Sequence, residues 1–307
     1  MGNEQARLLV TLPFPVEELG GHPVDFDYNV FHAGDPVEAL SNTSLWVTPY
    51  LEAVDYASIL PTMGQLSVVQ AQSAGTDDIA AWLPLGTTLC NARGVHDAAT
   101  AEMAATLILA SLRRLPAFVT AQARSRWQPD NGAQSLADKT VLILGYGSIG
   151  RALGRRLAGF ECDVVGVTRH GRDGSVRRSE LPALLPGADV VVVLTPLTSE
   201  THHMVSADFL SRMKDHSLLV NMARGPVVDT HALLAEVRAG RLNAALDVTD
   251  PEPLPPEHEL WRCPTVLITP HAGGGTSAMT ARIRRLVRTQ LFSFAAHEPL
   301  ANVVTIR

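Results

Sequence analysis

The sequence predicts an α/β protein built from two domains, each a doubly wound parallel sheet. Short apolar runs that are typical of strands alternate with stretches that are typical of helices along nearly the whole chain. Many of these runs are apolar at consecutive positions, as expected of strands buried on both faces of a parallel sheet. The length of 307 residues is too great for one ordinary core and suits two such domains.

The composition indicates a globular chain and disfavours several other classes. Hydrophobic residues make up 46% of the chain and charged residues 18%, with a net charge of −6. This balance does not favour a nucleic-acid partner. No apolar run approaches the roughly 20 residues of a membrane helix, and the first residues, MGNEQARLLV, lack the layout of a signal peptide. We therefore expect a cytoplasmic protein without a nucleic-acid or membrane partner.

The cysteines and a histidine pair do not predict a disulfide or a metal site. Cys90, Cys162 and Cys263 are far apart and form no CxxC pattern, so we expect buried, reduced thiols. His202 and His203 resemble a metal-binding pair, but adjacent residues on a strand or helix face different ways. We interpret both as surface residues and expect no metal.

The first hundred residues predict the sheet of the first domain. Two intervening stretches, 36–41 and 56–64, are typical of short helices. The expected strands span residues 7–13, 28–33, 44–50, 66–73 and 87–92.

A long alanine-rich helix is expected next, as a connector between the domains. Asp97 is a suitable N-cap, and Pro116 would stop the helix. Its apolar stripe comprises Met103, Leu107, Ile108 and Leu112. The polar, turn-rich residues 123–139 predict a loop or arm.

From residue 140 a second alternation predicts the sheet of the second domain. Helices are expected at 148–159 and 232–240, and a final helix at 277–297. The expected strands span residues 140–145, 163–168, 188–197, 217–223, 243–248 and 265–270.

A glycine fingerprint, GYGSIG, lies between the first strand and the first helix of this second alternation. Gly145 permits a tight turn, Gly147 lets the backbone approach a pyrophosphate, and Gly150 lets the helix pack closely on the strand. The helix N-terminus would then favour the phosphates. The glycines could serve a plain turn, but the strand–loop–helix–strand context predicts a Rossmann domain that binds a dinucleotide.

The acidic residue that usually binds the ribose is missing from its expected place. Arg169 lies nineteen positions after Gly150, preceded by Thr168 and followed by His170 and Arg172. An arginine can bind a 2′-phosphate through charge-assisted hydrogen bonds, which a carboxylate would repel. The sequence therefore favours NADP over NAD, with NAD possible if Arg169 is simply a solvated surface residue.

Polar residues that are suited to catalysis follow three later strands. Arg224 occurs in NMARG, Asp247 and Glu252 in ALDVTDPEPLP, and His271 in TPHAGG. Taken singly, the arginine could cap a strand end, Glu252 could be a solvated loop carboxylate, and His271 an ordinary loop histidine. At strand ends of one nucleotide-binding unit, Arg224, Glu252 and His271 together predict a catalytic set.

With these four motifs in this order, the chain resembles the D-isomer-specific 2-hydroxyacid dehydrogenase family, in particular its glyoxylate/hydroxypyruvate reductases. QAQSAGTDDI and NARGVHDAATAEM also resemble family segments, so that the likeness covers essentially the whole chain. The resemblance implies a flavodoxin-like substrate-binding (catalytic) domain of residues 1–97 plus 288–307, a Rossmann domain of residues 98–287 and an active site in the cleft between them. It also implies a homodimer, with the apolar 98–118 helix and the Trp127 arm as candidate contacts.

The resemblance implies a role for each catalytic candidate. Hydride passes from the nicotinamide to the carbonyl carbon of a 2-keto acid, and His271 supplies the proton to the oxygen. Glu252 orients the imidazole and favours its protonated form. Arg224 holds the substrate carboxylate and polarises the carbonyl. Asp247 would bond to the nicotinamide end of the cofactor, although a turn or cap role is the alternative.

Further contacts are implied for the cofactor and the substrate. Ser73, Ala74 and Gly75 would meet the substrate carboxylate through backbone N–H groups, with a plain strand-end turn as the alternative, and Arg224 and His271 would bind it from the other side. Trp46, Tyr50 and Trp127 could shape a pocket, fill the core or form a subunit contact. The other implied cofactor contacts are Ser148, Ile149, Thr195, Pro196, Met222, Ala223, His271 and Gly273.

We therefore expect an NADP-preferring reductase of a 2-keto acid, such as a glyoxylate- or hydroxypyruvate-like compound, that forms the D-2-hydroxy acid. One alternative is an NAD-linked dehydrogenase of another small anion, such as formate or phosphite. Another is a dinucleotide-sensing binding protein like the corepressors of this fold. The intact Arg–Glu–His set favours an enzyme.

Overall fold

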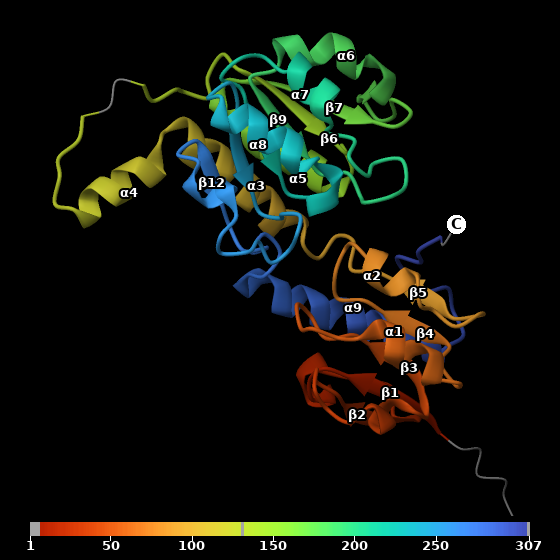
Figure 1. The fold of residues 1–307 in the computed structure, drawn as a ribbon. Coiled ribbons are helices and arrows are strands. Elements are labelled where there is room, and N and C mark those ends of the chain that lie inside the picture. Colours follow the sequence, from red (N-terminus) through yellow and green to blue (C-terminus); the bar gives the residue numbers. More distant parts are fainter. Residues whose placement is uncertain (1–6, 130–131, 306–307) are drawn as a thin grey trace, which may run out of the picture. The chain divides into compact units, whose positions relative to one another are not determined.

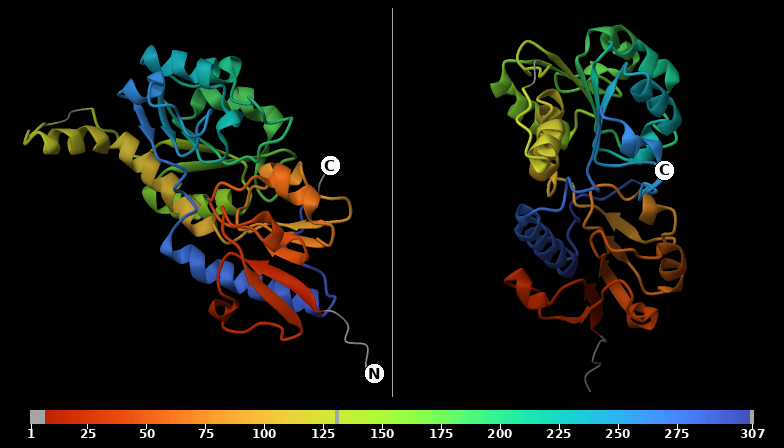
Figure 2. Two further views of the ribbon diagram at one scale, coloured as in Figure 1. Left: turned by 60° about the horizontal axis from the view of Figure 1, so that its bottom comes forward. Right: turned by 60° about the vertical axis from the view of Figure 1, so that its left-hand side comes forward.

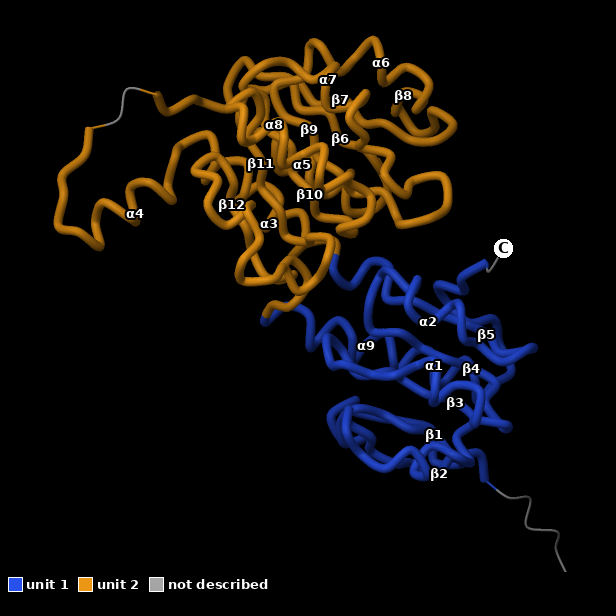
Figure 3. The backbone as a smooth tube through the Cα atoms, in the orientation of Figure 1, with its two compact units in different colours: residues 1–96, 277–307 blue, residues 97–276 orange. Residues whose placement is uncertain are grey.

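The computed structural model describes residues 7–129 and 132–305, which divide into two compact units. Unit 1 comprises Met1–His96 and Ser277–Arg307, and unit 2 comprises Asp97–Thr276 (Figure 3).

Unit 1 is built on a five-stranded sheet in which every pair of neighbouring strands is parallel (Figure 1). The strand order β2-β1-β3-β4-β5 is the flavodoxin-like order and confirms the predicted fold class. Each strand lies within or beside a predicted range. The strands are β1 (Leu8–Leu12), β2 (Phe26–Val30), β3 (Thr43–Val47), β4 (Val68–Gln70) and β5 (Thr88–Cys90).

Apolar residues alternate between the two faces of this sheet. In β3, Leu45 belongs to the core under the long helix α9 (Ser277–Ala295), whereas Trp46 belongs to the core on the other face. Trp46 is fully buried and therefore a core residue rather than a pocket residue. Short helical segments complete the unit: 3₁₀ turns at Val16–Leu19, Val37–Leu40 and Leu60–Thr62, and the helices α1 (Tyr56–Ile59) and α2 (Asp77–Ala80).

The chain returns to unit 1 earlier than expected. The expected boundary at residue 288 lies inside α9, and the whole of that helix groups with unit 1. The reason is its buried stripe, because Ile283, Val287 and Leu291 pack in one core with strands β1 and β3. A helix with one continuous apolar stripe is buried along its whole length against one sheet.

Unit 2 is built on a seven-stranded sheet, again with only parallel pairs. The strand order is β12-β11-β10-β9-β6-β7-β8. Successive strands are added on one side of β6 up to β8 and then, from β9 onward, on its other side, as in a Rossmann domain. Ligands bind at the carboxyl ends of the strands where the order switches. The two-residue β8 is an addition that the sequence did not predict. The strands are β6 (Thr140–Leu144), β7 (Asp163–Thr168), β8 (Val176–Arg177), β9 (Val190–Val193), β10 (Leu218–Asn221), β11 (Asn243–Leu246) and β12 (Val266–Ile268).

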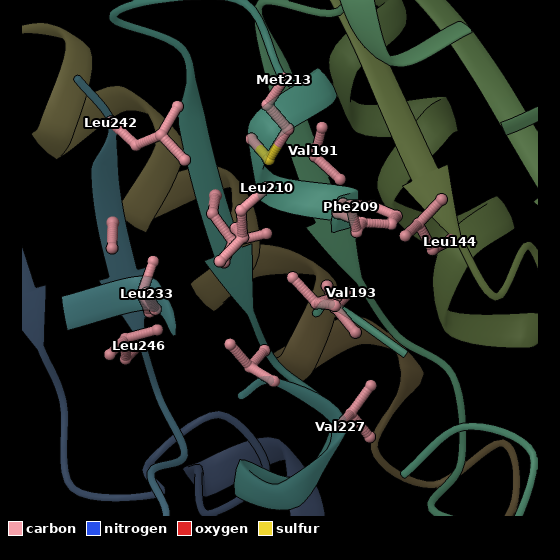
Figure 4. Packing of buried hydrophobic residues seen from close by; sticks show 14 of the residues in the cluster. Leu144, Val191, Val193, Phe209, Leu210, Met213, Val227, Leu233, Leu242 and Leu246 are labelled. Carbon is pink, nitrogen blue, oxygen red and sulfur yellow. The ribbon is translucent and has the colours of Figure 1, made fainter. Parts of the chain in front are cut away.

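Helices cover both faces of this sheet (Figures 1 and 2). On one face α3 (Asp97–Leu112) packs against α5 (Ser148–Leu157). On the other lie α6 (Leu181–Leu184), α7 (Ala207–Arg212) and α8 (Thr230–Arg238). Figure 4 shows this second core, where Val191 and Val193 of β9 share a cluster with Phe209 and Leu210 of α7. All four valines of β9 are fully buried, which explains its unbroken apolar run.

The alanine-rich helix ends earlier than expected. It begins at Asp97 itself and ends at Leu112, and Arg114 then adopts a left-handed φ of 54°. Pro116 therefore does not stop α3 but lies in the first turn of a new helix, α4 (Leu115–Ala123), where its missing N–H has no cost. Within the described residues no single helix is long and apolar enough to cross a membrane, and α3 with α4 meets that test only as a pair bent by 69°.

Candidate active site

The glycine fingerprint forms the turn between β6 and α5. Gly145 has a φ of 91°, and a Cβ atom there would lie 2.6 Å from the carbonyl carbon of Leu194. A Cβ atom on Gly150 would lie 2.7 Å from the carbonyl oxygen of Gly145. At Gly147, by contrast, no heavy atom of the described chain other than those of its immediate neighbours lies within 4 Å of such a Cβ. The outer glycines are thus required by the fold, and the middle one faces open space.

The N-terminus of α5 is suited to bind an anion. Gly147 is its N-cap, and among the described residues no side chain caps the helix there. The first turn also contains no acidic residue. Because the first N–H groups of a helix lack intrahelical partners and carry the positive end of its dipole, they favour a phosphate group.

Tyr146, inside the fingerprint, has a packing role that the sequence analysis missed. A Cβ atom on Gly166 of β7 would overlap its ring, and one on Gly154 of α5 would lie 2.6 Å from its hydroxyl oxygen. Two glycines outside the fingerprint therefore make room for this ring between the helix and the strand.

The loop that follows β9 lies against the glycine turn, as the contact of Leu194 with Gly145 shows. Thr195 in this loop has a buried hydroxyl with no hydrogen-bond partner in the described part of the chain. The carbonyl oxygen of Pro196 accepts a hydrogen bond of 2.6 Å from Thr201. A buried hydroxyl without a partner is unfavourable unless a ligand or water completes it. Together with the space at Gly147, this hydroxyl fits a bound dinucleotide.

Residues after β7 form a compact turn. The Thr168 hydroxyl lies 2.7 Å from that of Ser175 and accepts hydrogen bonds from the N–H groups of Gly171 and Arg172. The Arg169 guanidinium donates a hydrogen bond of 2.5 Å to Glu200, a residue of the loop after β9. A carboxylate therefore does lie at the end of β7, but it comes from the loop after β9, so no pattern near Arg169 could reveal it.

Arg224 lies three residues after the end of β10, and Asn221 fixes its loop. The Asn221 side chain is buried, accepts a hydrogen bond from the N–H of Ala223 and donates one of 3.0 Å to the carbonyl oxygen of Arg224. The Arg224 guanidinium donates a hydrogen bond of 2.9 Å to the carbonyl oxygen of Ala223. This role of Asn221 was not predicted. The signal available in the sequence was a polar residue at the end of an apolar strand that is expected to be buried.

His271 and Glu252 are paired. The Nδ1 atom of the imidazole lies 2.6 Å from Oε1 of Glu252. His271 has a left-handed φ of 50°, and its backbone N–H donates to the carbonyl oxygens of Asp247 and Thr269. Non-glycine residues rarely adopt this conformation, which is more frequent at functional sites. Because Nδ1 faces the carboxylate, Nε2 is the ring atom that remains for a substrate.

Asp247 holds the loop that carries His271. Its carboxylate is 3% exposed and accepts hydrogen bonds from the Thr269 hydroxyl at 2.6 Å, the Ala272 N–H at 2.9 Å and the Gly273 N–H at 3.0 Å. This is the turn role that the sequence left open as the alternative. A Cβ atom on Gly273 would lie 2.8 Å from both the Asp247 carboxylate and the Met222 methyl group, so the loops after β10, β11 and β12 meet here.

The charges around Glu252 keep it ionised. Burial is the largest single influence and raises its pKa, but the hydrogen bond and the charge of His271 lower it. A backbone hydrogen bond from Thr249 and the positive charge of Arg224 act in the same direction, so that the pKa of Glu252 lies below its usual value. The influence of Arg224 on this pKa indicates that all three predicted catalytic residues share one electrostatic environment.

The predicted substrate residues lie in unit 1, directly after β4. The Ser73 hydroxyl donates a hydrogen bond of 2.5 Å to the carbonyl oxygen of Gly75, and Asn91 donates one of 2.9 Å to that of Ala74. Tyr50 stacks on His96 with a ring-centroid distance of 5.2 Å. Trp127 in unit 2 is 97% exposed, so it fills no pocket within its unit.

The histidine pair corrects one expectation. His202 and His203 are exposed, as predicted, but their rings stack with centroids 4.1 Å apart instead of facing different ways. The expectation was wrong because the pair lies in a turn, where His203 has a φ of 49°, and not in a strand or helix.

Fold and site together define an oxidoreductase built on a Rossmann domain. Residues 105–273 match the family model described as D-isomer specific 2-hydroxyacid dehydrogenase, NAD binding domain. The chain therefore belongs to the D-isomer-specific 2-hydroxyacid dehydrogenase family, which confirms the resemblance of its motifs and makes it an NAD(P)-dependent dehydrogenase of that family.

Similar proteins agree with this assignment. A glyoxylate reductase of Thermofilum pendens is 33% identical over 252 residues, which cover 77% of this chain and 74% of that protein. A family structure from Aeromonas salmonicida has a TM-score of 0.87 and 27% identity and covers 98% of this chain and 99% of that one. A structure from Sinorhizobium meliloti, described as an NADPH-dependent glyoxylate/hydroxypyruvate reductase with NADP and sulfate, has a TM-score of 0.81 and 27% identity, covering 98% and 99%.

Proposed function

We propose that the protein is an NADP-preferring reductase that converts a small 2-keto acid, of the glyoxylate or hydroxypyruvate type, into the D-2-hydroxy acid. The observation that carries the proposal is the His271–Glu252 pair, which lies at the carboxyl ends of the Rossmann strands and within electrostatic reach of Arg224. Ligands bind at this end of such sheets. A bound nicotinamide dinucleotide would supply the hydride.

His271 is the proposed proton donor. With Nδ1 held by Glu252 at 2.6 Å, the tautomer and the ring orientation are set, and Nε2 can give a proton to the carbonyl oxygen. An ionised Glu252 also stabilises the imidazolium form that donates the proton. The low pKa of Glu252 supports this role, because the carboxylate stays charged at neutral pH.

Arg224 is the proposed substrate anchor. Its guanidinium can bind a carboxylate through two parallel hydrogen bonds and polarise the adjacent carbonyl. The hydrogen bonds of Asn221 fix the backbone from which it extends. Ser73, Ala74 and Gly75 remain proposed contacts for the same substrate carboxylate.

The cofactor would be held by the α5 N-terminus, the space beside Gly147 and the unpartnered Thr195 hydroxyl. Arg169 supports NADP as the preferred form, since a guanidinium at this position suits a 2′-phosphate. The NADPH dependence described for the Sinorhizobium meliloti relative is consistent with this choice. Asp247 would act as a positioning residue for His271, in addition to the implied contact with the nicotinamide end. We also propose that the protein is a cytoplasmic homodimer.

The test is a spectrophotometric assay of the purified protein. NADPH or NADH is mixed with a panel of 2-keto acids, and loss of the nicotinamide absorbance is followed. We expect faster oxidation of NADPH than of NADH with at least one of the small 2-keto acids. If neither NADPH nor NADH is oxidised with any of the 2-keto acids, the result would favour a dinucleotide sensor. Oxidation of NADH but not of NADPH would refute the preference for NADP.

A further inference from the structure

Two arginines and one glutamate form a charged cluster at the end of β7. The Arg169 guanidinium lies 2.5 Å from Oε1 of Glu200, and the Arg178 guanidinium lies 3.3 Å from Oε2 of the same residue. One carboxylate thus bridges two guanidinium groups. All three side chains are partly exposed, between 36% and 53%, so a ligand in solution can reach them.

The sheet register explains why the two arginines are neighbours. Parallel strands β7 and β8 end on the pair Thr168–Arg177, and Arg169 and Arg178 are the next residue on each strand. Two like charges at adjacent positions repel each other, and an anion between them offsets this repulsion. Glu200 supplies that anion from the loop that follows β9.

The other carboxylates of this region have different partners. Glu180 accepts a hydrogen bond from the N–H of Arg177, and Asp173 pairs with Arg151 at 3.8 Å. Glu200 is therefore the carboxylate that the structure shows between Arg169 and Arg178.

We infer that the 2′-phosphate of NADP replaces the Glu200 carboxylate between Arg169 and Arg178, so that Glu200 is an internal competitor that limits the preference for NADP. The inference rests on the proposed function, because it assumes that Arg169 faces the ribose of the cofactor. A phosphate is a stronger acceptor for two guanidinium groups than one carboxylate. It binds, however, only after the Glu200 pairs open, and the displaced carboxylate still repels it from nearby.

NAD does not meet the same obstacle. Its 2′-hydroxyl carries no charge, so Glu200 does not repel it and Arg169 need not be released. Glu200 can also accept a hydrogen bond from that hydroxyl, which is the function of the acid that is missing from the usual sequence position. The carboxylate therefore weakens binding of NADP selectively, and Arg178 becomes a second ligand of the 2′-phosphate.

The experiment measures binding and not turnover. Dissociation constants for NADP⁺ and NAD⁺ are determined by isothermal titration calorimetry for the full chain and its Glu200→Gln, Arg178→Gln and Arg169→Gln variants. Asp173→Asn is the matched control, because it removes one negative charge from the turn between β7 and β8 without touching Arg169 or Arg178. Asparagine also tolerates the left-handed φ of 53° at that position.

We expect Glu200→Gln to raise the ratio of the NAD⁺ to the NADP⁺ dissociation constant by about three- to tenfold. The variant lacks the exposed ion pairs that the 2′-phosphate must displace, and such pairs contribute about this much. Arg178→Gln should weaken NADP⁺ binding by about tenfold and leave NAD⁺ binding unchanged. Asp173→Asn should leave the ratio as it is in the unaltered protein.

Two results would overturn the inference in distinguishable ways. If Arg169→Gln lowers the ratio but Glu200→Gln leaves it unchanged, or if Asp173→Asn raises it equally, the role of Glu200 is wrong and the NADP preference stands. If the unaltered protein binds NADP⁺ no better than NAD⁺ and Arg169→Gln changes nothing, the proposed cofactor preference itself fails.

Discussion

The Nδ1 atom of His271 lies 2.6 Å from Oε1 of Glu252, although 19 residues separate them in the chain. Two features of the fold bring them together. The Asp247 carboxylate holds the loop around His271, and the left-handed backbone of His271 directs its imidazole to the carboxylate.

Glu252→Gln keeps a hydrogen-bond acceptor but removes the charge, and we expect kcat to fall by about 10- to 100-fold, as for other residues that orient a catalytic imidazole. The pKa of Glu252 is lowered, so its ionised form persists until the pH falls through that lowered value, below 4.5. In the unaltered protein, the ¹³C NMR signal of the Glu252 carboxyl group should therefore keep its ionised position from neutral pH down to about 5 and shift only below it.

A carboxyl signal that already shifts between pH 8 and about 6 would show that Glu252 titrates there and would contradict the lowered pKa. Because the Glu252 side chain is 39% exposed, solvent screens its pairing, and the unfolding free energies of the two proteins should differ little. Urea unfolding at neutral pH serves as the control for this point.

Arg224→Lys should lower kcat/KM by roughly 10²- to 10³-fold, since a lysine cannot reproduce two parallel hydrogen bonds to a carboxylate. Steady-state kinetics with the best 2-keto acid check this, and KM should rise together with the fall in kcat. Arg212→Lys is the matched control, because Arg212 pairs with Asp208 one turn away on the surface of α7. Equal effects of the two substitutions would show that Arg224 does not bind the substrate.

Asp247→Ala should lower the unfolding free energy by about 1–3 kcal/mol, because the buried N–H group of Gly273 and the partly buried one of Ala272 lose their acceptor. Thr269→Val removes only one of the hydrogen bonds to this carboxylate and should cost about 1 kcal/mol. Urea denaturation of both variants measures the difference. Should the two variants prove equally stable, Asp247 does not hold the loop as described.

Gly166→Ala should destabilise the protein by about 1–3 kcal/mol, because the new methyl group would overlap the Tyr146 ring. Tyr146→Ala removes that ring, so the double variant should be more stable than the sum of the two single effects predicts. Thermal unfolding of the four proteins provides the cycle. Additive effects would mean that the ring and the glycine do not interact.

Much of the fold was predictable because most strands of both sheets contain a short apolar run, of which the four valines of β9 are the clearest. The two-residue strand β8 was not, since it contains no such run. The early end of α3 depends on the left-handed Arg114, and the sequence instead suggested a stop at Pro116. The boundary at Ser277 depends on which of the two sheets buries α9. The amphipathic pattern of the helix predicts a buried face but does not indicate the sheet against which it packs.

The candidate site divides in the same way. Gly145 and Gly150 were predictable because they belong to a short motif between a strand and a helix, and a Cβ atom at either position would clash with backbone atoms. Glu200 was not, because its position beside Arg169 arises from two loops that follow strands separated in the sheet by β6. Long-range partners of this kind leave no pattern at either residue.

The most direct test of the central claim is a single-turnover measurement of NADPH oxidation by His271→Ala, with His202→Ala, an exposed histidine of the same unit, as control. The account predicts that the unaltered protein and the control oxidise NADPH with a small 2-keto acid at similar rates. His271→Ala should still bind NADPH and react about 10²- to 10⁴-fold more slowly at neutral pH. A reaction of His271→Ala at the unaltered rate would contradict the account.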